Sequence, residues 1–263
     1  MKNVRTYGEA PFSIAVIHGG PGAPGYLAPV GRELSKDRGV LEPLQTAASL
    51  QGQILELKAV LEKHGSLPVT LIGHSYGAML SIFFYAVYPV LIKKIILVGS
   101  GPLEEKYADG IMDTRLNRLS NVERNESAAL IDFLNEPGLN GKNTVLSRLG
   151  FLCKKADCFD PLTLHEEELE CQFRIHKMVW MVVQKQRSSG KLLKLARLVQ
   201  CPVVAIHGDY DPHPAEGVKQ PLSAAVKNFK FILLENCGHY PWLEREARDT
   251  FFKTLREELS QRM

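Results

Sequence analysis

The sharpest chemical signal in the sequence is a serine held between two glycines, at residues 73–77 (GHSYG). The pattern G-x-S-x-G is typical of a sharp turn from a strand into a helix, and here the apolar run 69–72 precedes it and an apolar, helix-like run follows it. Small flanking residues are needed because this turn strains the serine backbone and lifts its hydroxyl clear of the sheet. We therefore expect Ser75 to be a nucleophile and the backbone N–H of Tyr76 to face a developing oxyanion.

A serine hydroxyl becomes a useful nucleophile only when a base takes its proton and an acid orients that base. His239 is the best candidate for the base among the eight histidines, because it follows the apolar run 229–234 and lies in a turn before a helix-like segment. From a loop after the last strand of a sheet, its imidazole can reach across to Ser75. Three other histidines could shape the site, although each is fixed beside the strand that it ends: His18, His74 and His207.

The acid is expected on the loop after the preceding apolar run, 202–206. This loop, residues 207–214, reads HGDYDPHP and offers two carboxylates. Asp211 lies farther out on the loop, where its side chain can turn back toward His239, and it is the preferred acid. Asp209 directly follows the strand end, where a carboxylate more often braces a turn, and it remains the alternative. The chain order serine, aspartate, histidine is one that triads of this kind adopt.

A glycine-rich loop at residues 18–22 (HGGPG) follows the first buried run, 12–17. Such a loop can expose backbone N–H groups toward an oxyanion. Taken alone, the string is equally typical of a plain turn, but beside the serine turn we expect it to form half of an oxyanion hole. The preferred donor is the N–H of Gly20, with Gly19 as the alternative, and Tyr76 would supply the second donor.

Short runs of β-branched and apolar residues alternate with helix-like segments, which predicts an α/β protein with a parallel sheet and helices on both faces. The predicted strands are residues 12–17, 69–72, 95–98, 202–206 and 229–234. Between them, residues 103–198 carry charged, helix-like stretches and no run typical of a central strand. We expect residues 1–102 and 199–263 to form the core and residues 103–198 to form a helical lid. The strongest helix signal in this lid is at 164–187.

Together these pieces resemble the α/β-hydrolase superfamily, over roughly residues 12–102 and 200–260. The string HGGPG at 18–22 is similar to the motif of proline iminopeptidase-like serine hydrolases, and GHYPWLE at 238–244 is similar to the histidine-bearing end of many members. The resemblance implies the α/β-hydrolase fold, a mostly parallel central sheet flanked by helices with a helical lid inserted between strands. It also implies the same roles for the site residues, with Ser75, His239 and Asp211 catalytic and the amides of Gly20 and Tyr76 in the oxyanion hole.

The chain departs from the iminopeptidase branch in two features. The D-x-R-G-x-G-x-S-like loop typical of that branch has no counterpart in residues 37–48 (DRGVLEPLQTAA). Iminopeptidases also hold the amino terminus of the substrate with carboxylates of the lid. The lid offers a run of glutamates that is more typical of a solvated helix face: Glu166, Glu167, Glu168 and Glu170.

Composition argues against several classes of function. Thirty-two Lys and Arg residues against 29 Asp and Glu give a net charge of +3, which is too balanced to indicate a nucleic-acid partner. No apolar run is long enough to span a membrane, and the N-terminus lacks the long apolar segment of a signal peptide. The five scattered cysteines indicate reduced thiols and a cytoplasmic protein. Because no cluster has metal-ligand spacing, neither a metal nor an organic cofactor is expected.

The sequence therefore predicts a serine hydrolase that cleaves an ester or amide bond of a small-molecule or short-peptide substrate through an acyl-enzyme. The alternatives are a proline iminopeptidase-like aminopeptidase and a non-catalytic ligand receptor on the same fold. Apolar residues of the lid are candidates for lining the pocket: Phe133, Phe151, Phe173, Met178 and Trp180. None of these patterns determines the oligomeric state.

Overall fold

The computed structural model describes residues 3–138, 140–163 and 169–261. Its centre is a seven-stranded sheet in the order β1-β3-β2-β4-β5-β6-β7, in which β1 is antiparallel to β3 and the remaining pairs are parallel. The strands are β1 (Val4–Tyr7), β2 (Phe12–Ile17), β3 (Gly39–Pro43), β4 (Val69–His74), β5 (Ile92–Val98), β6 (Val203–Gly208) and β7 (Phe229–Leu234). The predicted, mostly parallel sheet is confirmed. The C-terminal ends of its parallel strands all lie at the same end of the sheet, so the loops that follow β2, β4, β6 and β7 lie close together.

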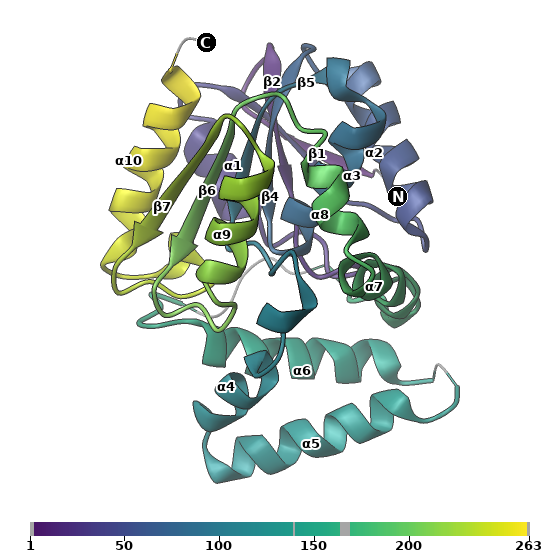
Figure 1. Cartoon of the computed structure of the whole chain (residues 1–263). Coiled ribbons are helices and arrows are strands. Elements are labelled where there is room, and N and C mark those ends of the chain that lie inside the picture. The colour runs from purple at the N-terminus through teal and green to yellow at the C-terminus, as the bar shows by residue number, and fades with distance from the viewer. Residues whose placement is uncertain (1–2, 139, 164–168, 262–263) are drawn as a thin grey trace.

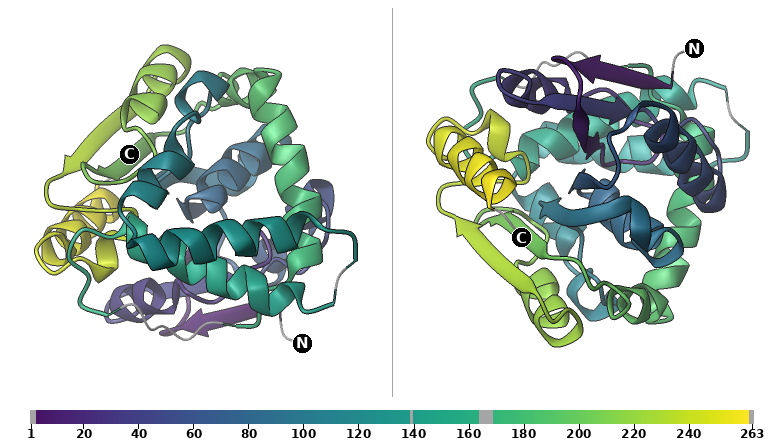
Figure 2. Two further views of the ribbon diagram at one scale, coloured as in Figure 1. Left: turned by 90° about the horizontal axis from the view of Figure 1, so that it is seen from below. Right: turned by 90° about the horizontal axis from the view of Figure 1, so that it is seen from above.

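Helices cover both faces of this sheet (Figures 1 and 2). The helices are α1 (Ala28–Leu34), α2 (Leu50–His64), α3 (Tyr76–Val87), α4 (Ile111–Asn117), α5 (Asn121–Asn135), α6 (Lys142–Asp157), α7 (Phe173–Ser188), α8 (Lys191–Ala196), α9 (Glu216–Ala225) and α10 (Ala247–Ser260). Buried side chains of α2, α3, α7, α8 and α9 form one hydrophobic cluster with one face of the sheet. Those of α1 and α10 form a second cluster with the other face. The helix α3 is buried almost all round, as its uniformly apolar sequence predicts.

The segment predicted to be a lid divides into two parts by its packing. Helices α4, α5 and α6 lie across the end of the sheet where its parallel strands terminate, and they carry a small apolar cluster of their own (Figures 1 and 2). In contrast, the buried side chains of α7 and α8 belong to the hydrophobic cluster that α2, α3 and α9 form with one face of the sheet. The helix predicted at 164–187 is found at 173–188, residues 169–172 are not helical, and residues 164–168 lie outside the described residues.

Two strands at one side of the sheet were not identified from the sequence. Strand β1 is short, contains Arg5, and lies at the edge of the sheet, so it lacks a strong apolar pattern. Strand β3 is fully buried although it contains Glu42. The hydroxyl of Tyr7 donates a hydrogen bond of 2.5 Å to Glu42 Oε2, and this partner is brought in only when the two strands pair. In the described part of the chain, no helix combines the length and the apolar character needed to cross a membrane.

Candidate active site

Ser75 lies on the sharp turn between β4 and α3, as predicted. Its backbone is strained, with a positive φ of 52° and a ψ of −115°, and its N–H donates to the carbonyl of Val98 at 3.0 Å. The flanking glycines are required by close backbone packing. A Cβ atom at Gly73 would overlap the backbone of Gly77, and one at Gly77 would overlap the carbonyl oxygen of Ile17 on the neighbouring strand β2. The sequence can therefore form this strained turn only because Gly73 and Gly77, two residues before and two residues after the serine, lack side chains.

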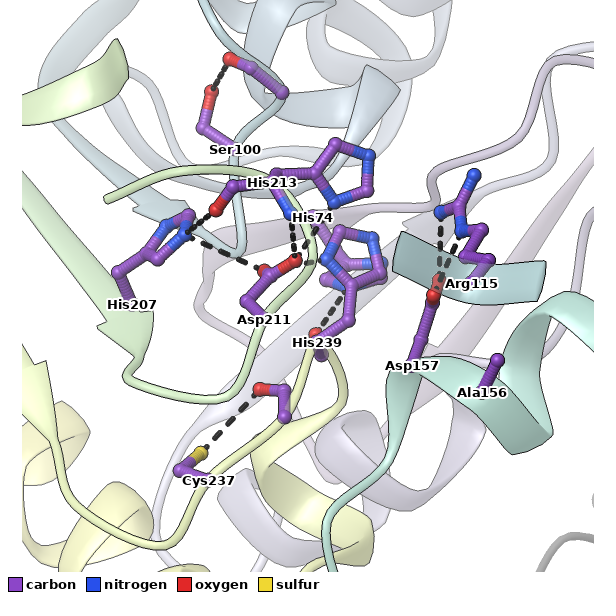
Figure 3. A network of polar contacts seen from close by, with 12 residues as sticks. His74, Ser100, Arg115, Ala156, Asp157, His207, Asp211, His213, Cys237 and His239 are labelled. Atoms are coloured by element: carbon purple, nitrogen blue, oxygen red, sulfur yellow. Dashed lines mark hydrogen bonds and ion pairs between the residues drawn. The ribbon is translucent and has the colours of Figure 1, made fainter. Parts of the chain in front are cut away.

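His239 lies on the loop after β7 and is 2% exposed. Its backbone N–H donates to the carbonyl of Asp157 at 2.8 Å, which fixes the loop against the end of α6. Its ring Nδ1 lies 2.6 Å from Oδ2 of Asp211 (Figure 3). The imidazole lines the same cavity as Ser75. The structure therefore places the imidazole predicted as the base beside the carboxylate predicted as the acid, and in the cavity that Ser75 lines.

Asp211 is the centre of a histidine cluster (Figure 3). Its side chain is fully buried, and its second oxygen, Oδ1, accepts hydrogen bonds from the backbone N–H of His213 at 2.9 Å and from the ring Nδ1 of the same residue at 2.7 Å. The ring of His207 lies 3.5 Å from Oδ2. Burial opposes ionisation of Asp211, but the surrounding imidazoles hold the pKa of its carboxyl well below the usual range. An ionised carboxylate only accepts hydrogen bonds, so His239 keeps its proton on Nδ1 and its Nε2 is left to accept one.

Asp209, the alternative acid, is placed differently. Its side chain is exposed, and Oδ1 accepts a hydrogen bond of 3.1 Å from the backbone N–H of Cys237. It braces the turn between the loops after β6 and β7 and does not contact His239. The geometry thus favours Asp211 over Asp209 as the partner of the imidazole.

The glycine-rich loop packs directly on the serine. A Cβ atom at Gly19 would lie 2.7 Å from the Cβ of Ser75. The N–H of Gly19 donates to the hydroxyl of Tyr26, so it is already occupied. Gly20 lines the same cavity as Ser75, and Tyr76 occupies the first position of α3, where a backbone N–H has no partner within the helix. These positions suit the two amides expected of an oxyanion hole, with Gly20 preferred to Gly19.

A chain of hydrogen bonds links the glycine-rich loop to the histidine loop. The hydroxyl of Tyr26 lies 2.9 Å from Nδ1 of His74, and Nε2 of His74 lies 2.9 Å from the carbonyl oxygen of His239. Burial holds the pKa of His74 well below its ordinary value, so the ring is neutral. It therefore donates from Nε2 to the carbonyl and accepts at Nδ1 from Tyr26. The sequence offered no signal for Tyr26, and placed His74 at the site without a partner.

An ion pair between α4 and α6 lies next to the loop that carries His239. Arg115 of α4 donates to both carboxylate oxygens of Asp157 at 2.7 and 2.6 Å. Asp157 is 1% exposed, and its carbonyl is the acceptor for the backbone N–H of His239. The sequence did not identify either residue, because their pairing joins two helices that are far apart in the chain. The pair couples the position of α4 and α6 to that of the imidazole.

Two cavities meet at Ser75 and Arg115. The first, of about 220 Å³, also contains Gly20, Tyr26, His239 and parts of α6, and the second, of about 230 Å³, contains Tyr76 and parts of α4 and α7. Of the predicted lining residues, Phe151 lines the first cavity and Trp180 the second. The others lie elsewhere: Phe133 and Met178 are exposed, and Phe173 is buried at the start of α7.

The groups with the best potential as metal ligands in the described residues are Asp211, His213 and His239, whose ligand atoms lie within 4.8 Å of one another. Their hydrogen-bonded atoms are only 2.6 and 2.7 Å apart. Two ligands of a tetrahedral zinc ion at its usual bond lengths are separated by about 3.3 Å. The cluster is therefore built as a hydrogen-bond network, and its rings would have to move apart to enclose an ion.

The lid glutamates considered for binding an amino terminus are not assembled around Ser75 in the described residues. Glu170 is exposed and accepts a hydrogen bond of 3.1 Å from Asn143. Glu166, Glu167 and Glu168 lie outside the described residues. Asp157 is the one carboxylate among the described residues that line the first cavity, and it is paired with Arg115.

Comparison with solved structures finds the same fold in several hydrolases. The chain is similar to a putative lipase from Acinetobacter baumannii AYE, with a TM-score of 0.64, 18% identity and coverage of 99% of this chain and 90% of the other. It is also similar to the monoacylglycerol lipase of Paleococcus ferrophilus, with a TM-score of 0.63, 15% identity and 97% coverage of both chains. A third relative in structure is Est816, an N-acyl homoserine lactone degrading enzyme, with a TM-score of 0.64, 13% identity and coverage of 97% and 95%.

The comparisons support the resemblance to α/β-hydrolases but not the resemblance to the proline iminopeptidase branch. The three structures are described as a putative lipase, a monoacylglycerol lipase and a lactone-degrading enzyme, so the expected likeness to the proline iminopeptidase branch is not supported. The sequence finds no match among curated proteins. Residues 16–252 match the sequence model of the alpha/beta hydrolase family. Because this match spans most of its 263 residues, the chain belongs to the alpha/beta hydrolase family.

Proposed function

We propose that this protein is a serine hydrolase that cleaves carboxylic esters of small substrates through an acyl-enzyme on Ser75. The observation that carries the proposal is the convergence of a strained serine turn with a buried imidazole–carboxylate pair, in which His239 and Asp211 are 2.6 Å apart and the imidazole shares a cavity with the serine. Strain at a non-glycine residue is retained where function requires it.

The reaction follows from the protonation states in the site. Nε2 of His239 takes the proton of the Ser75 hydroxyl as the oxygen attacks the ester carbonyl, and Asp211 stabilises the imidazolium that forms. The N–H groups of Gly20 and Tyr76 donate to the tetrahedral oxyanion, and each such donor lowers the barrier by about 3 kcal/mol. The imidazolium then protonates the leaving alcohol oxygen. Water, deprotonated by the same ring, hydrolyses the acyl-enzyme and restores the serine.

Two features favour an ester over the peptide of the alternative aminopeptidase hypothesis. The single described carboxylate of the first cavity, Asp157, is neutralised by Arg115 and is not available to hold a substrate amino group. The structural relatives named above are described as lipases and a lactone-degrading enzyme, whose substrates contain ester bonds. The cavities of about 220 and 230 Å³ suit short substrates. We propose residues 103–198 as the lid, with α4 to α6 covering Ser75.

A paired substrate screen tests this function. We expect the purified protein to hydrolyse p-nitrophenyl esters of short acyl chains with a much higher kcat/KM than aminoacyl p-nitroanilides, and Ser75→Ala to abolish ester turnover. The matched control is Ser147→Ala, because Ser147 lines the same cavity but lies on α6. Faster release from the anilides would support the aminopeptidase. A folded wild type that turns over neither class, yet binds ester analogues, would support a ligand receptor.

A further inference from the structure

The second cavity at Ser75 has mostly apolar walls. Met79, Ile111, Met112 and Trp180 line it, together with backbone at the start of the loop after β5. An apolar wall of this kind suits an acyl chain, because burial of each methylene contributes about 0.8 kcal/mol. The first cavity contains His239, which must protonate the leaving oxygen. The leaving group is therefore assigned to the first cavity and the acyl chain to the second.

Both arginines that line the second cavity are already paired with carboxylates. Arg115 is held by Asp157, and Arg187 donates to both carboxylate oxygens of Glu105 at 2.8 and 3.3 Å. His213 differs from them. Its Nδ1 contacts Asp211, while Nε2 has no hydrogen-bond partner among the described residues.

The protonation state of His213 determines what Nε2 can bind. Oδ1 of ionised Asp211 only accepts hydrogen bonds, so the neutral ring carries its hydrogen on Nδ1. Burial lowers the pKa of His213 to about 4, despite the opposing effect of Asp211. At neutral pH the ring is uncharged, and Nε2 presents a lone pair. Its ring stacks on that of His239 at a centroid distance of 4.4 Å, which fixes its orientation beside the reacting groups.

We propose that His213 is a specificity-determining residue whose Nε2 accepts a hydrogen bond from a hydroxyl or amide N–H group on the acyl part of the substrate. The preferred substrates are then esters whose acyl chain carries such a donor within a few atoms of the carbonyl and is otherwise apolar. This inference rests on the proposed ester hydrolysis at Ser75. A single hydrogen-bond acceptor in an otherwise apolar cavity favours acyl groups that carry a hydroxyl or amide N–H over acyl groups without such a donor.

The test compares matched esters that differ in one donor. The probes are p-nitrophenyl esters of 2-hydroxybutanoate and 3-hydroxybutanoate, with their methyl ethers, in which the oxygen can accept but not donate. We expect kcat/KM for at least one hydroxy ester to exceed that of its ether by about 3- to 10-fold, as one neutral hydrogen bond allows. His213→Asn places an amide at the position of Nδ1, preserves a donor to Asp211 and removes Nε2, so the ratio should fall to about one.

The control variant is Gln184→Ala, because Gln184 is another polar residue of the same cavity and its removal should leave the ratio intact. His213→Gln, whose amide oxygen can reach the position of Nε2, should restore part of the preference if His213→Asn folds poorly. Equal rates for hydroxy ester and ether in the wild type would overturn the inference, as would a preference that survives His213→Asn. Failure of the wild type to hydrolyse any of the esters would instead contradict the proposed function.

Discussion

Replacing Asp211 with asparagine should disable the imidazole while preserving the shape of the site. Both carboxylate oxygens of Asp211 are acceptors, Oδ2 for His239 and Oδ1 for two donors of His213. An asparagine has one oxygen, and it satisfies more donors by facing His213. Its NH₂ group then faces His239 and forces the hydrogen of that ring onto Nε2, from where the ring cannot accept the proton of Ser75.

The expected cost is a loss of about 10⁴-fold in kcat, or about 5 kcal/mol of barrier, because the wrong tautomer removes general-base catalysis and leaves binding and the oxyanion hole intact. The assay is p-nitrophenyl butanoate hydrolysis, with thermal unfolding to confirm the fold. Asp209→Asn is the matched control: the asparagine oxygen can still accept from Cys237, so activity should stay within a few-fold of the wild type. A severe loss in Asp209→Asn with a mild one in Asp211→Asn would refute this reasoning.

Three further predictions concern the scaffold of the site. Gly77→Ala should prevent stable folding, because its Cβ would overlap a backbone carbonyl of β2. Gly150→Ala in α6 is the opposite case: its Cβ would have no neighbour within 4 Å, so the variant should gain up to about 1 kcal/mol in unfolding free energy, measured by chemical denaturation. Burial lowers the pKa of His213 to about 4, so protonation of this ring should destabilise the folded protein by about 3 kcal/mol in total as pH falls from about 6.5 to 4. The difference in unfolding free energy between the wild type and His213→Asn, measured across this pH range, should report the change. Burial raises the pKa of Glu42 to about 7, so this residue acts in the opposite direction. The unfolded chain releases the Glu42 proton near pH 4.5 and the folded chain only near pH 7, so wild-type stability falls as pH rises from about 4.5 to about 7 and is constant above that. Glu42→Gln should therefore gain about 3 kcal/mol relative to the wild type between pH 4.5 and pH 8.

Each of these predictions has a contradicting outcome. A Gly77→Ala protein that unfolds with wild-type stability would show that β2 and α3 are less closely packed than described. A stability difference at His213 that does not vary with pH would show that this ring titrates normally. A Glu42→Gln variant that loses stability most above pH 7 would show that the buried carboxylate is favoured in its charged form by Tyr7 and Arg5.

Local sequence patterns predicted the parts of the fold that depend on neighbouring residues. The five predicted strands and the turn at Ser75 are found, because each strand is a short apolar run bounded by residues typical of turns. Strands β1 and β3 were missed because their polar residues become buried only when Tyr7 and Glu42 meet across the pair. The packing of α7 against one face of the sheet could not be inferred from the sequence. An amphipathic pattern predicts that a helix buries one of its faces, but it does not identify the element against which that face packs.

The candidate site shows the same limit. The two loops that carry Asp211 and His239, after β6 and after β7, could be predicted from the order of the strands, and the structure places the two side chains together. His213, two residues after Asp211, could have been noticed as a second imidazole on the same loop. Tyr26 and Arg115 had no local signal, because each acts through a contact with a residue remote in sequence. Long-range polar pairs of this kind are specified by tertiary packing.

The central claim, that residue 75 is an activated nucleophile, is tested most directly by covalent trapping. Intact-mass analysis after treatment with a fluorophosphonate should show one adduct per chain, located on the peptide that contains Ser75. The adduct should be absent in Ser75→Ala, present in Ser147→Ala and slowed by orders of magnitude in His239→Ala. An unmodified wild type that remains folded, or an adduct that persists in Ser75→Ala, would contradict the account.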